Sequence, residues 1–276
     1  MKKLYFSCGL ALVLAASCNK VEIAPGPEPR PEEKTVNLSY EGTANCYLLS
    51  EPGDYSFDAT VRGNGAETEG LAKPAALAPA GAKLVWETEK GLVSAVSYAD
   101  GKISFTSSGK PGNALIAALD ADDNIIWSWH IWYPEDEVLT YGLKSGYRAM
   151  NMDLGALAAE FSTDSDVKPY GMLYQWGRKD PFPPAPTRTG DTQTVGAPLY
   201  DADGKEVSIG HTSWTSADEN TLAFSIANPT VCVASGALAA TSQDWLSESV
   251  DGLWGNPYGS IRDKATNTYP NKGAKS

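Results

Sequence analysis

The chain has few of the residues that build metal and nucleophile sites, and little positive charge. Its 276 residues include two histidines and four cysteines, and 22 Lys and Arg stand against 34 Asp and Glu, for a formal net charge of −12. Nucleic acids and anionic membranes are bound by clustered Lys and Arg, so neither partner is expected. Hydrophobic residues make up 42% of the chain, which is enough for a core. The length suits one large domain or two ordinary ones.

Signatures of common enzymes are also missing from the sequence. It contains no serine nucleophile elbow, no P-loop and no glycine-rich dinucleotide-binding turn after a strand. The segment Gly63-Asn64-Gly65 continues into polar residues and is interpreted as a loop. Two carboxylates could support a glycosidase, but no feature singles out a pair. We therefore predict a non-catalytic protein without a cofactor.

Residues 1–17 have the pattern of a lipoprotein signal peptide. Lys2 and Lys3 precede an apolar run at 4–16, which is too short to span a bilayer but suits a signal-peptide core. Small residues then lead into Cys18, which we expect to be diacylated and to become the new N-terminus. Ordinary secretion with cleavage near Ser17 is the alternative. Loss of the two lysines makes the mature chain more acidic still, and two acyl chains give stable anchoring.

A proline-rich tether follows at residues 18–34. Four prolines alternate with other residues: Pro25, Pro27, Pro29 and Pro31. This spacing favours an extended, semi-rigid chain and excludes helix and inner strand. We expect the tether to hold a folded part, which begins near Thr35, away from the membrane. A disordered tether is the alternative.

The cysteine count leaves two thiols in the folded part. Cys8 lies in the signal core and Cys18 is the expected lipid site, so Cys46 and Cys232 remain. We expect two buried free thiols, although an oxidising compartment permits a disulfide between them.

Residues 35–134 have β periodicity throughout. Strands are expected at 45–49, 55–57, 84–86, 93–98, 102–106, 114–119 and 125–132. Asp100 and Gly101 supply a tight turn between two of them, with Ile103 and Phe105 facing the core. The segment 114–119 is apolar on both faces, which indicates a central strand. This pattern predicts a mainly β fold, an immunoglobulin-like antiparallel β-sandwich.

Two Asp-rich turns, at 120–124 and 201–205, begin like calcium-binding loops. Their twelfth positions are Ile131 and Thr212, where a bidentate Glu belongs, so neither is an EF-hand. We predict hairpin turns built on Asp side-chain hydrogen bonds, with no metal bound.

The strand at 125–132 carries three tryptophans. Alternation places its side chains on two faces, one with Trp127, Trp129 and Ile131 and the other with Ser128, His130 and Trp132. We predict that one face joins the sandwich core and the other a domain interface. An aromatic platform for a sugar ring is the alternative. His130 has no cysteine or second histidine near it in the sequence, so a zinc site is not expected.

From residue 135 onward the strand pattern ends, and Gly, Pro and Trp residues recur along the chain. Glu135-Asp136-Glu137 is interpreted as a charged hinge, and a short helical turn is expected at 157–161. Prolines 181–186 force an irregular loop. Residues 135–276 are therefore expected to form a loop-rich α+β region held by aromatic anchors.

Several segments resemble those of fimbrillin-like surface lipoproteins that carry a FISUMP-type (major paralogous) domain. The most specific is Tyr174-Gln175-Trp176-Gly177-Arg178-Lys179-Asp180-Pro181-Phe182. Less specific matches are Asn45-Cys46-Tyr47 with Pro52-Gly53-Asp54-Tyr55, the tryptophan strand, and Leu253-Trp254-Gly255-Asn256-Pro257. Met152-Asp153-Leu154-Gly155-Ala156 is similar to a family segment but lacks its Arg-Asn pair, so any role of that Arg is absent here. The resemblance covers most of the chain after Ala44.

The resemblance implies a lipid-anchored protein of the cell outer membrane that faces outward. It also implies a C-terminal domain with a fold like C-type lectins and formylglycine-generating enzymes. We predict cell adhesion by binding of a glycan or a partner subunit, with Tyr174, Trp176, Arg178 and Trp254 as candidate ligand-binding residues. The alternatives are a fimbrial subunit that polymerises by strand donation and a degenerate scaffold without a ligand.

Residues after Pro257 are mostly polar and offer no closing strand for such a domain. We expect the chain to stop partway through it, by truncation or frameshift. A naturally short variant is the alternative.

Overall fold

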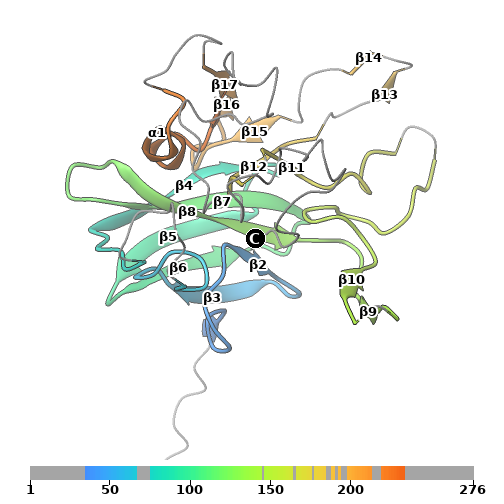
Figure 1. Cartoon of the computed structure of the whole chain (residues 1–276), viewed down its shortest axis with the longest axis horizontal. Helices are drawn as coiled ribbons and strands as arrows, with labels where there is room; N and C mark the ends of the chain where they lie inside the picture. The colour runs from blue at the N-terminus through green and yellow to red at the C-terminus, as the bar shows by residue number, and fades with distance from the viewer. Residues whose placement is uncertain are drawn as a thin grey trace, which may run out of the picture. The chain divides into compact units, whose positions relative to one another are not determined.

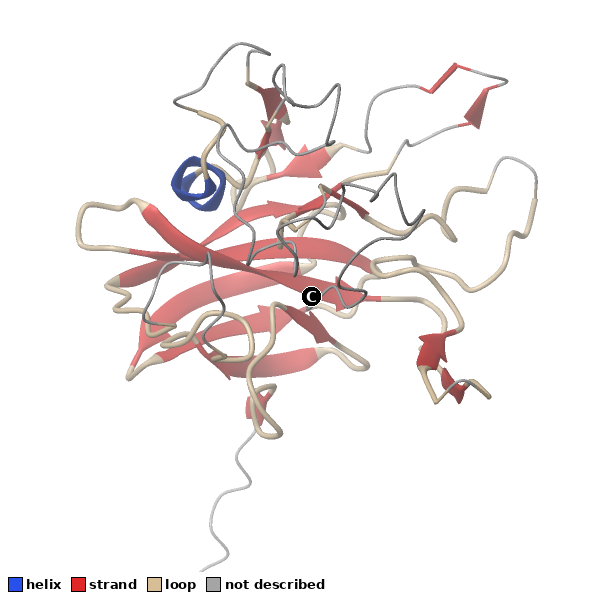
Figure 2. Ribbon diagram, in the orientation of Figure 1, coloured by secondary structure: helices blue, strands red, loops and turns tan. Residues whose placement is uncertain are grey.

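The structure is a computed structural model whose described part is mainly β (Figures 1 and 2). It describes residues 35–66, 75–144, 146–163, 166–175, 177–184, 188–189, 192–193, 198–212 and 219–233. The chain divides into two units, Met1–Glu33 and Lys34–Ser276, and every described residue belongs to the second. Within these residues, no helix is both long and apolar enough to cross a membrane.

Most of the strand residues lie in two sheets. The first has the order β1 (Thr35–Asn37), β3 (Gly53–Asp58), β6 (Lys102–Ser107), β5 (Val93–Ala99). The second has the order β16 (Glu206–Val207), β15 (Leu199–Tyr200), β4 (Gly81–Glu87), β7 (Gly112–Leu119), β8 (Ile125–Tyr133), β2 (Cys46–Leu48). Small strand pairs are β9 (Thr140–Gly142) with β10 (Arg148–Met150), β11 (Leu173–Tyr174) with β12 (Pro181–Phe182), β13 (Arg188–Thr189) with β14 (Thr192–Gln193), and β17 (Gly210–His211) with β18 (Val231–Cys232).

The two sheets face each other across one hydrophobic core. Phe57 of β3 stands between aromatic side chains of the second sheet, with its ring centroid 4.9 Å from that of Tyr47 and 5.1 Å from that of Trp129. Phe57 and Trp129 have no exposed surface. Burial of such large apolar side chains is the main stabilising contribution to a fold of this kind. The predicted mainly β fold is confirmed.

The hairpin of β5 and β6 forms as the sequence predicts. Asp100 and Gly101 have φ of 50° and 80°, the left-handed pair that a two-residue hairpin turn requires. Ala99 is paired with Lys102 directly across that turn. Ile103 and Phe105 are buried in the shared core, as expected from strand alternation.

The prediction of a central strand at 114–119 is also confirmed. Every residue of β7 is buried, and the strand lies between β4 and β8. Ile116 faces the core between the two sheets, whereas Leu115 packs with Trp86 on the outer face of the second sheet. The outer face is thus covered by other parts of the chain, which explains why this strand lacks alternation.

The sheets are mixed, where the sequence predicted antiparallel ones. β1 pairs in parallel with β3, and β2 pairs in parallel with β8. The strands on either side of Pro52-Gly53-Asp54 both form, but they join different sheets. Consecutive strands that lie in different sheets do not pair with each other, so each can pair in parallel with a strand from elsewhere in the chain. The local sequence pattern does not reveal such a pairing.

Residues 157–161 do not form the expected helical turn. The amides of Leu157 and Ala158 both donate to the carbonyl of Lys168, and the amide of Ala159 donates to the Asp136 carboxylate. Distant acceptors therefore replace the local bonds of a helix. Among the described residues a helix forms instead at α1 (Leu222–Ala227), where the Thr221 hydroxyl accepts from the amide of Phe224 and caps the first turn.

Both Asp-rich turns have the predicted construction. One Asp120 carboxylate oxygen accepts from the amides of Asp122 and Asn124, each at 2.9 Å. Asp201 accepts in the same way from the amides of Asp203 and Lys205. These bonds hold the carboxylates in the turn itself.

Strands from late in the chain extend the second sheet. β15 pairs with β4 through Tyr200 and Glu87, and β16 pairs with β15. The described residues after Tyr133 also cover the outer face of β7 and β8, where two small clusters form around Trp86 and Trp132. The outer face of this sheet is therefore an interior surface.

Candidate functional site

The strongest concentration of charged and polar side chains lies on the outer face of β8. Ser128 and His130 point to this face, and both are about 1% exposed. The β11–β12 hairpin, which carries the motif at 174–182, packs over it. The predicted alternation of β8 is confirmed: one face joins the core between the sheets, and the other is buried by later parts of the same compact unit.

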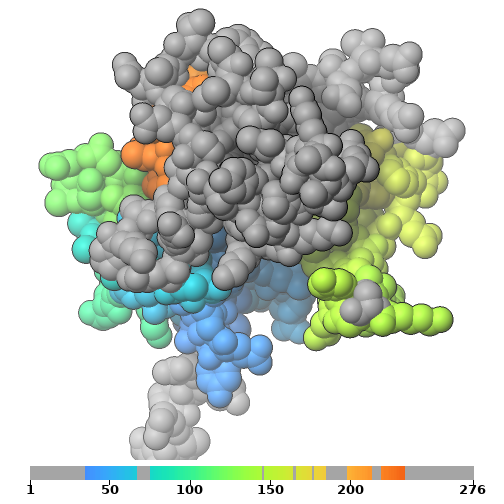
Figure 3. Space-filling model, in the orientation of Figure 1, coloured from blue at the N-terminus to red at the C-terminus, as the bar shows by residue number. Residues whose placement is uncertain are grey.

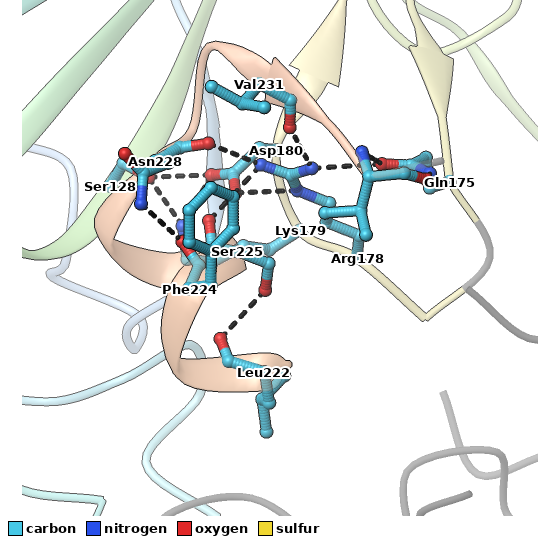
Figure 4. Close-up of polar contacts among 11 residues, drawn as sticks. Ser128, Gln175, Arg178, Lys179, Asp180, Leu222, Phe224, Ser225, Asn228 and Val231 are labelled. Carbon is cyan, nitrogen blue, oxygen red and sulfur yellow. Dashed lines mark hydrogen bonds and ion pairs between the residues drawn. The ribbon is translucent and has the colours of Figure 1, made fainter. Parts of the chain in front are cut away.

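Asp180 is the centre of a buried charge cluster, shown in Figure 4. One of its carboxylate oxygens accepts from the Ser128 hydroxyl at 2.6 Å and from the Lys179 ammonium. The other accepts from Arg178 Nε at 3.2 Å. Two buried cations thus share one buried carboxylate. A cation–π contact also stabilises the Lys179 ammonium, because its Nζ lies 4.7 Å from the centroid of the Trp127 ring.

The Arg178 guanidinium is saturated by protein acceptors. Besides Nε to Asp180, Nη1 donates to Gln175 Oε1 and the Val231 carbonyl, and Nη2 donates to the carbonyls of Ser225 and Asn228. These bonds use all five N–H groups of the side chain. Burial lowers the pKa of Arg178, and the neighbouring Asp180 opposes that shift. Arg178 therefore ties the end of α1 and β18 to the β11–β12 hairpin.

Gln175 strengthens the same connection. Its amide nitrogen donates to the Val233 carbonyl at 2.7 Å, and its amide oxygen accepts from the Val233 amide at 3.0 Å. This two-way pairing extends β18 with a side chain in place of a strand. The side chains of Gln175 and Arg178 thus hold residues 225–233 against the β11–β12 hairpin, and Asp180 holds Arg178 in place; Figure 4 shows the contacts of Arg178.

His130 lies in a second network beside the charge cluster. Asn113 donates its amide to the Gly155 carbonyl at 2.9 Å, so its Oδ1 accepts at 2.8 Å from His130 Nε2. The other ring nitrogen, Nδ1, is then unprotonated and accepts from the Tyr174 hydroxyl at 2.9 Å and the Cys46 thiol at 3.3 Å. The imidazole is neutral, with both nitrogens satisfied.

The protonation of this network follows from its burial. Desolvation lowers the pKa of His130 to about 3 and raises that of the Cys46 thiol to about 12. Burial also raises the pKa of the Tyr174 hydroxyl. All three groups are therefore uncharged near neutral pH. The thiol is inert there, because the thiolate is the reactive form.

Two of the predicted ligand-binding residues belong to these networks. Arg178 is 7% exposed with every donor occupied, and the hydroxyl of half-buried Tyr174 is bound to His130. A ligand would have to displace protein partners to reach their polar groups. Trp176, Trp254 and the expected lipid site Cys18 lie outside the described residues.

The tryptophans of β8 do not form an open platform for a sugar. Trp127, Trp129 and Trp132 are 4%, 0% and 2% exposed. The Trp132 indole nitrogen donates to the Ala156 carbonyl at 2.7 Å, which fixes the ring in the junction with the later part of the chain. Their role is packing and anchoring.

Cys46 and Cys232 are free thiols, as predicted, although each is half-buried. Cys46 does contact His130, and this pair was not predicted because the two residues are far apart in the sequence. Among the residues that the structure describes, no group of three or more His, Cys, Asp or Glu is arranged to hold a metal ion.

A contrasting surface lies on the hairpin of β9 and β10, which projects at the lower right of Figures 1 and 3. We call residues 138–152 the apolar hairpin. Its exposed large side chains are Leu139, Tyr141, Leu143, Tyr147 and Met150, with exposed fractions from 40% to 74%. The sequence interpretation missed this surface. The signal available was a turn at Gly146 within a run of 15 residues that has no acidic side chain.

No protein-family model, curated protein or solved structure matches the chain.

Proposed function

We propose that the protein is a lipid-anchored, non-catalytic binding protein of the cell surface, of fimbrial or adhesin type. The observation that carries this proposal is the contrast between the closed polar networks and the exposed apolar hairpin. The charged and titratable side chains packed at the outer face of β8 are bound to protein partners, whereas large apolar side chains on the hairpin face solvent. An exposed apolar patch is typical of a surface that binds another molecule.

The anchor is supported by the sequence at residues 1–34, with its short apolar run, Cys18 and alternating prolines. We further propose an immunoglobulin-like arrangement for the two facing sheets and a lectin-like one for the loop-rich region. The facing sheets with their shared core support the first. The short strand pairs formed by the described residues after Tyr133 support the second.

Metabolic labelling with a fatty acid tests the anchor. We expect label on the wild-type chain and none on a Cys18→Ala variant, with Cys8→Ala as the matched control that keeps the label. An unlabelled wild-type chain, or label that persists in Cys18→Ala, contradicts lipidation at this residue.

Of the two ligand classes, a partner subunit fits the hairpin better than a glycan. Three of its five exposed large side chains are aliphatic Leu or Met, which suit a protein surface. A glycan array probed with the full chain separates the two. Binding that is lost in Trp176→Ala or Trp254→Ala but kept in Tyr147→Ala assigns a glycan to the later region of the chain.

Strand donation between subunits is a second candidate, supported by β1. This edge strand has three exposed residues, pairs only with β3 within the described part, and directly follows the tether. An edge of this kind can exchange its strand for a neighbour's. Polymers resistant to mild denaturant are the expected product, and a strictly monomeric native protein opposes this candidate. If glycan and partner binding are both absent, the scaffold without a ligand is the remaining interpretation.

A further inference from the structure

The apolar hairpin is anchored at its base, where buried Met152 and half-buried Val138 pack in the Trp132 cluster, and its large side chains beyond that base are exposed. Its backbone bonds join Leu143 to Tyr147 and Asn151 to Leu139, and all three residues of β9 are exposed. A two-stranded hairpin alone is marginally stable in water and needs a third strand or a packed face. The hairpin therefore has the form of an element that is completed by a partner.

The charge of the hairpin indicates the kind of partner. Residues 138–152 contain Lys144 and Arg148 and no acidic residue, in a chain with a net charge of −12. Both basic side chains lie in or beside the turn that Tyr147 and Leu143 flank. The hairpin thus presents apolar side chains together with local positive charge, which suits an apolar surface with acidic residues.

Such a surface exists on the same chain, along β1, the edge strand of the first sheet. We call it the acidic edge. It combines two exposed apolar side chains, Val36 and Tyr40, with two exposed carboxylates, Glu41 and Glu51. Residues 35–61 contain no Lys or Arg.

The two carboxylates lie near the two ends of β1. Thr35 is paired with Asp54, three residues after Glu51, and the Ser39 hydroxyl accepts from the amide of Asp58 at the other end, two residues before Glu41. Unpaired backbone groups on short edge strands are a common place for another strand pair to dock.

We propose that the apolar hairpin of one copy docks on the acidic edge of a second copy. This inference rests on the proposed binding function and names the partner. Each copy then offers one hairpin and one edge, so the contact is head-to-tail and propagates along a row of molecules unless the row closes into a ring.

Two other contacts of the hairpin are disfavoured by charge. Hairpin against hairpin would bring Lys144 and Arg148 of both copies together. An anionic bilayer would attract the hairpin but repel the remainder of the chain, whose acidic residues outnumber its basic ones. The acidic edge of a second copy meets neither objection.

Site-specific photocrosslinking identifies the partner directly. A photoreactive phenylalanine analogue replaces Tyr147 in the full chain, purified in non-ionic detergent, and crosslinked peptides are mapped by mass spectrometry. We expect crosslinks to residues 36–54 of a second copy. Crosslinks confined to the second copy's hairpin, crosslinks only to lipid, detergent or another protein, or no crosslinks at all overturn the proposal.

Charge reversal tests the complementarity independently. In Lys144→Glu/Arg148→Glu the hairpin becomes acidic, and in Glu41→Lys/Glu51→Lys the edge becomes basic. We expect each variant alone to self-associate about 10-fold more weakly than wild type, measured by sedimentation velocity. An equal mixture should regain association, because each variant then meets an edge or hairpin of opposite sign.

The matched controls reverse exposed charges elsewhere. Lys83→Glu/Lys102→Glu and Asp122→Lys/Asp203→Lys change the net charge by the same amounts, and we expect association within about 2-fold of wild type. A loss in the controls equal to that in the hairpin and edge variants, or no recovery in the mixture, overturns the specific contact.

These results are separable from the anchor. Lipid labelling at Cys18 and the crosslinks at Tyr147 are measured on different residues, so a failed contact leaves the anchored binding protein standing. Conversely, an unlabelled Cys18 leaves the contact between copies untouched.

Discussion

At the scale of single residues, Asp180 has the largest expected effect on stability. It is the carboxylate that faces both Arg178 and Lys179, and its side chain is 1% exposed. Asp180→Asn leaves two buried cations without a counter-charge. We expect a loss of about 3–5 kcal/mol in the free energy of unfolding, measured by denaturant titration with tryptophan fluorescence.

Ser128→Ala is the matched control for this substitution. It removes the bond that the hydroxyl donates to the same carboxylate and the bond that it accepts from the Lys179 ammonium, and it leaves all three charges in place. The expected loss is about 1–2 kcal/mol. Equal, small losses in both variants would mean that water reaches the cluster and screens the charges.

His130 gives the protein a specific acid sensitivity. Its pKa is lowered from 6.5 to about 3 by burial, so the unfolded chain binds a proton that the folded protein excludes. This contribution to stability is fully present above pH 6.5 and is lost as the pH falls toward 3. Between pH 7 and 5 we expect wild type to lose about 2 kcal/mol more than His130→Gln, which keeps a donor and an acceptor but does not titrate.

The comparison needs only denaturant titrations of both proteins at several pH values. Parallel curves for wild type and His130→Gln would show that the histidine titrates alike in the folded and unfolded states.

The sequence pointed to the motif at 174–182 but not to its role. Arg178 was predicted to bind a ligand, and Asp180 carried no prediction beyond its place in the motif. Their partners, Ser128, Asn228 and Val231, come from other elements. Strand and turn patterns describe neighbours in the chain, so a pairing between distant segments leaves no local signal.

At the scale of elements, two glycines with the same φ allow the cost of backbone strain to be measured apart from the cost of side-chain crowding. Gly146 and Gly155 share a φ of 84°, and a side chain at either is strained. A Cβ at Gly146 would meet nothing within 4 Å, whereas one at Gly155 would collide with the Met172 side chain and approach Asn113 Oδ1. We expect Gly146→Ala to cost about 1 kcal/mol and Gly155→Ala about 3 kcal/mol or more.

Thermal unfolding of the two variants measures this difference. If they melt together, Met172 moves aside at little cost and the packing around Gly155 is loose.

The strands of 84–132 could be predicted because each carries its own pattern. Asp100-Gly101 marks a turn, alternation marks the faces of β6, and the unbroken apolar run marks β7. The parallel partners of β1 and β2 could not be predicted in this way, because register across a sheet depends on segments far apart in sequence. The same limit hid the apolar hairpin, whose exposure depends on which surfaces the rest of the fold leaves uncovered.

At the scale of the whole molecule, the first hundred folded residues depend on the later part of the chain. Trp86, Leu115 and Trp132 on the outer face of the second sheet are buried by residues after Tyr133. A chain that ends at residue 134 would expose these side chains and His130 to water. We expect it to bind the dye ANS strongly and to aggregate, with the full chain as the control.

A fragment that unfolds cooperatively and leaves ANS fluorescence unchanged would contradict this dependence. It would show that residues 35–134 form an independent domain.

The parallel pairing of β2 with β8 has a consequence for the order in which the protein acquires its structure. Cys46 meets His130 across a separation of 84 residues, and β15 completes the same sheet from still later in the chain. Contacts of long range slow folding, because a large loop must close before any of its contacts form. For a chain that carries the export signal proposed here, the N-terminal segments emerge first and wait for their partners. Slow folding keeps such a chain unfolded, and therefore able to pass through a narrow translocation channel, until its last strands have crossed.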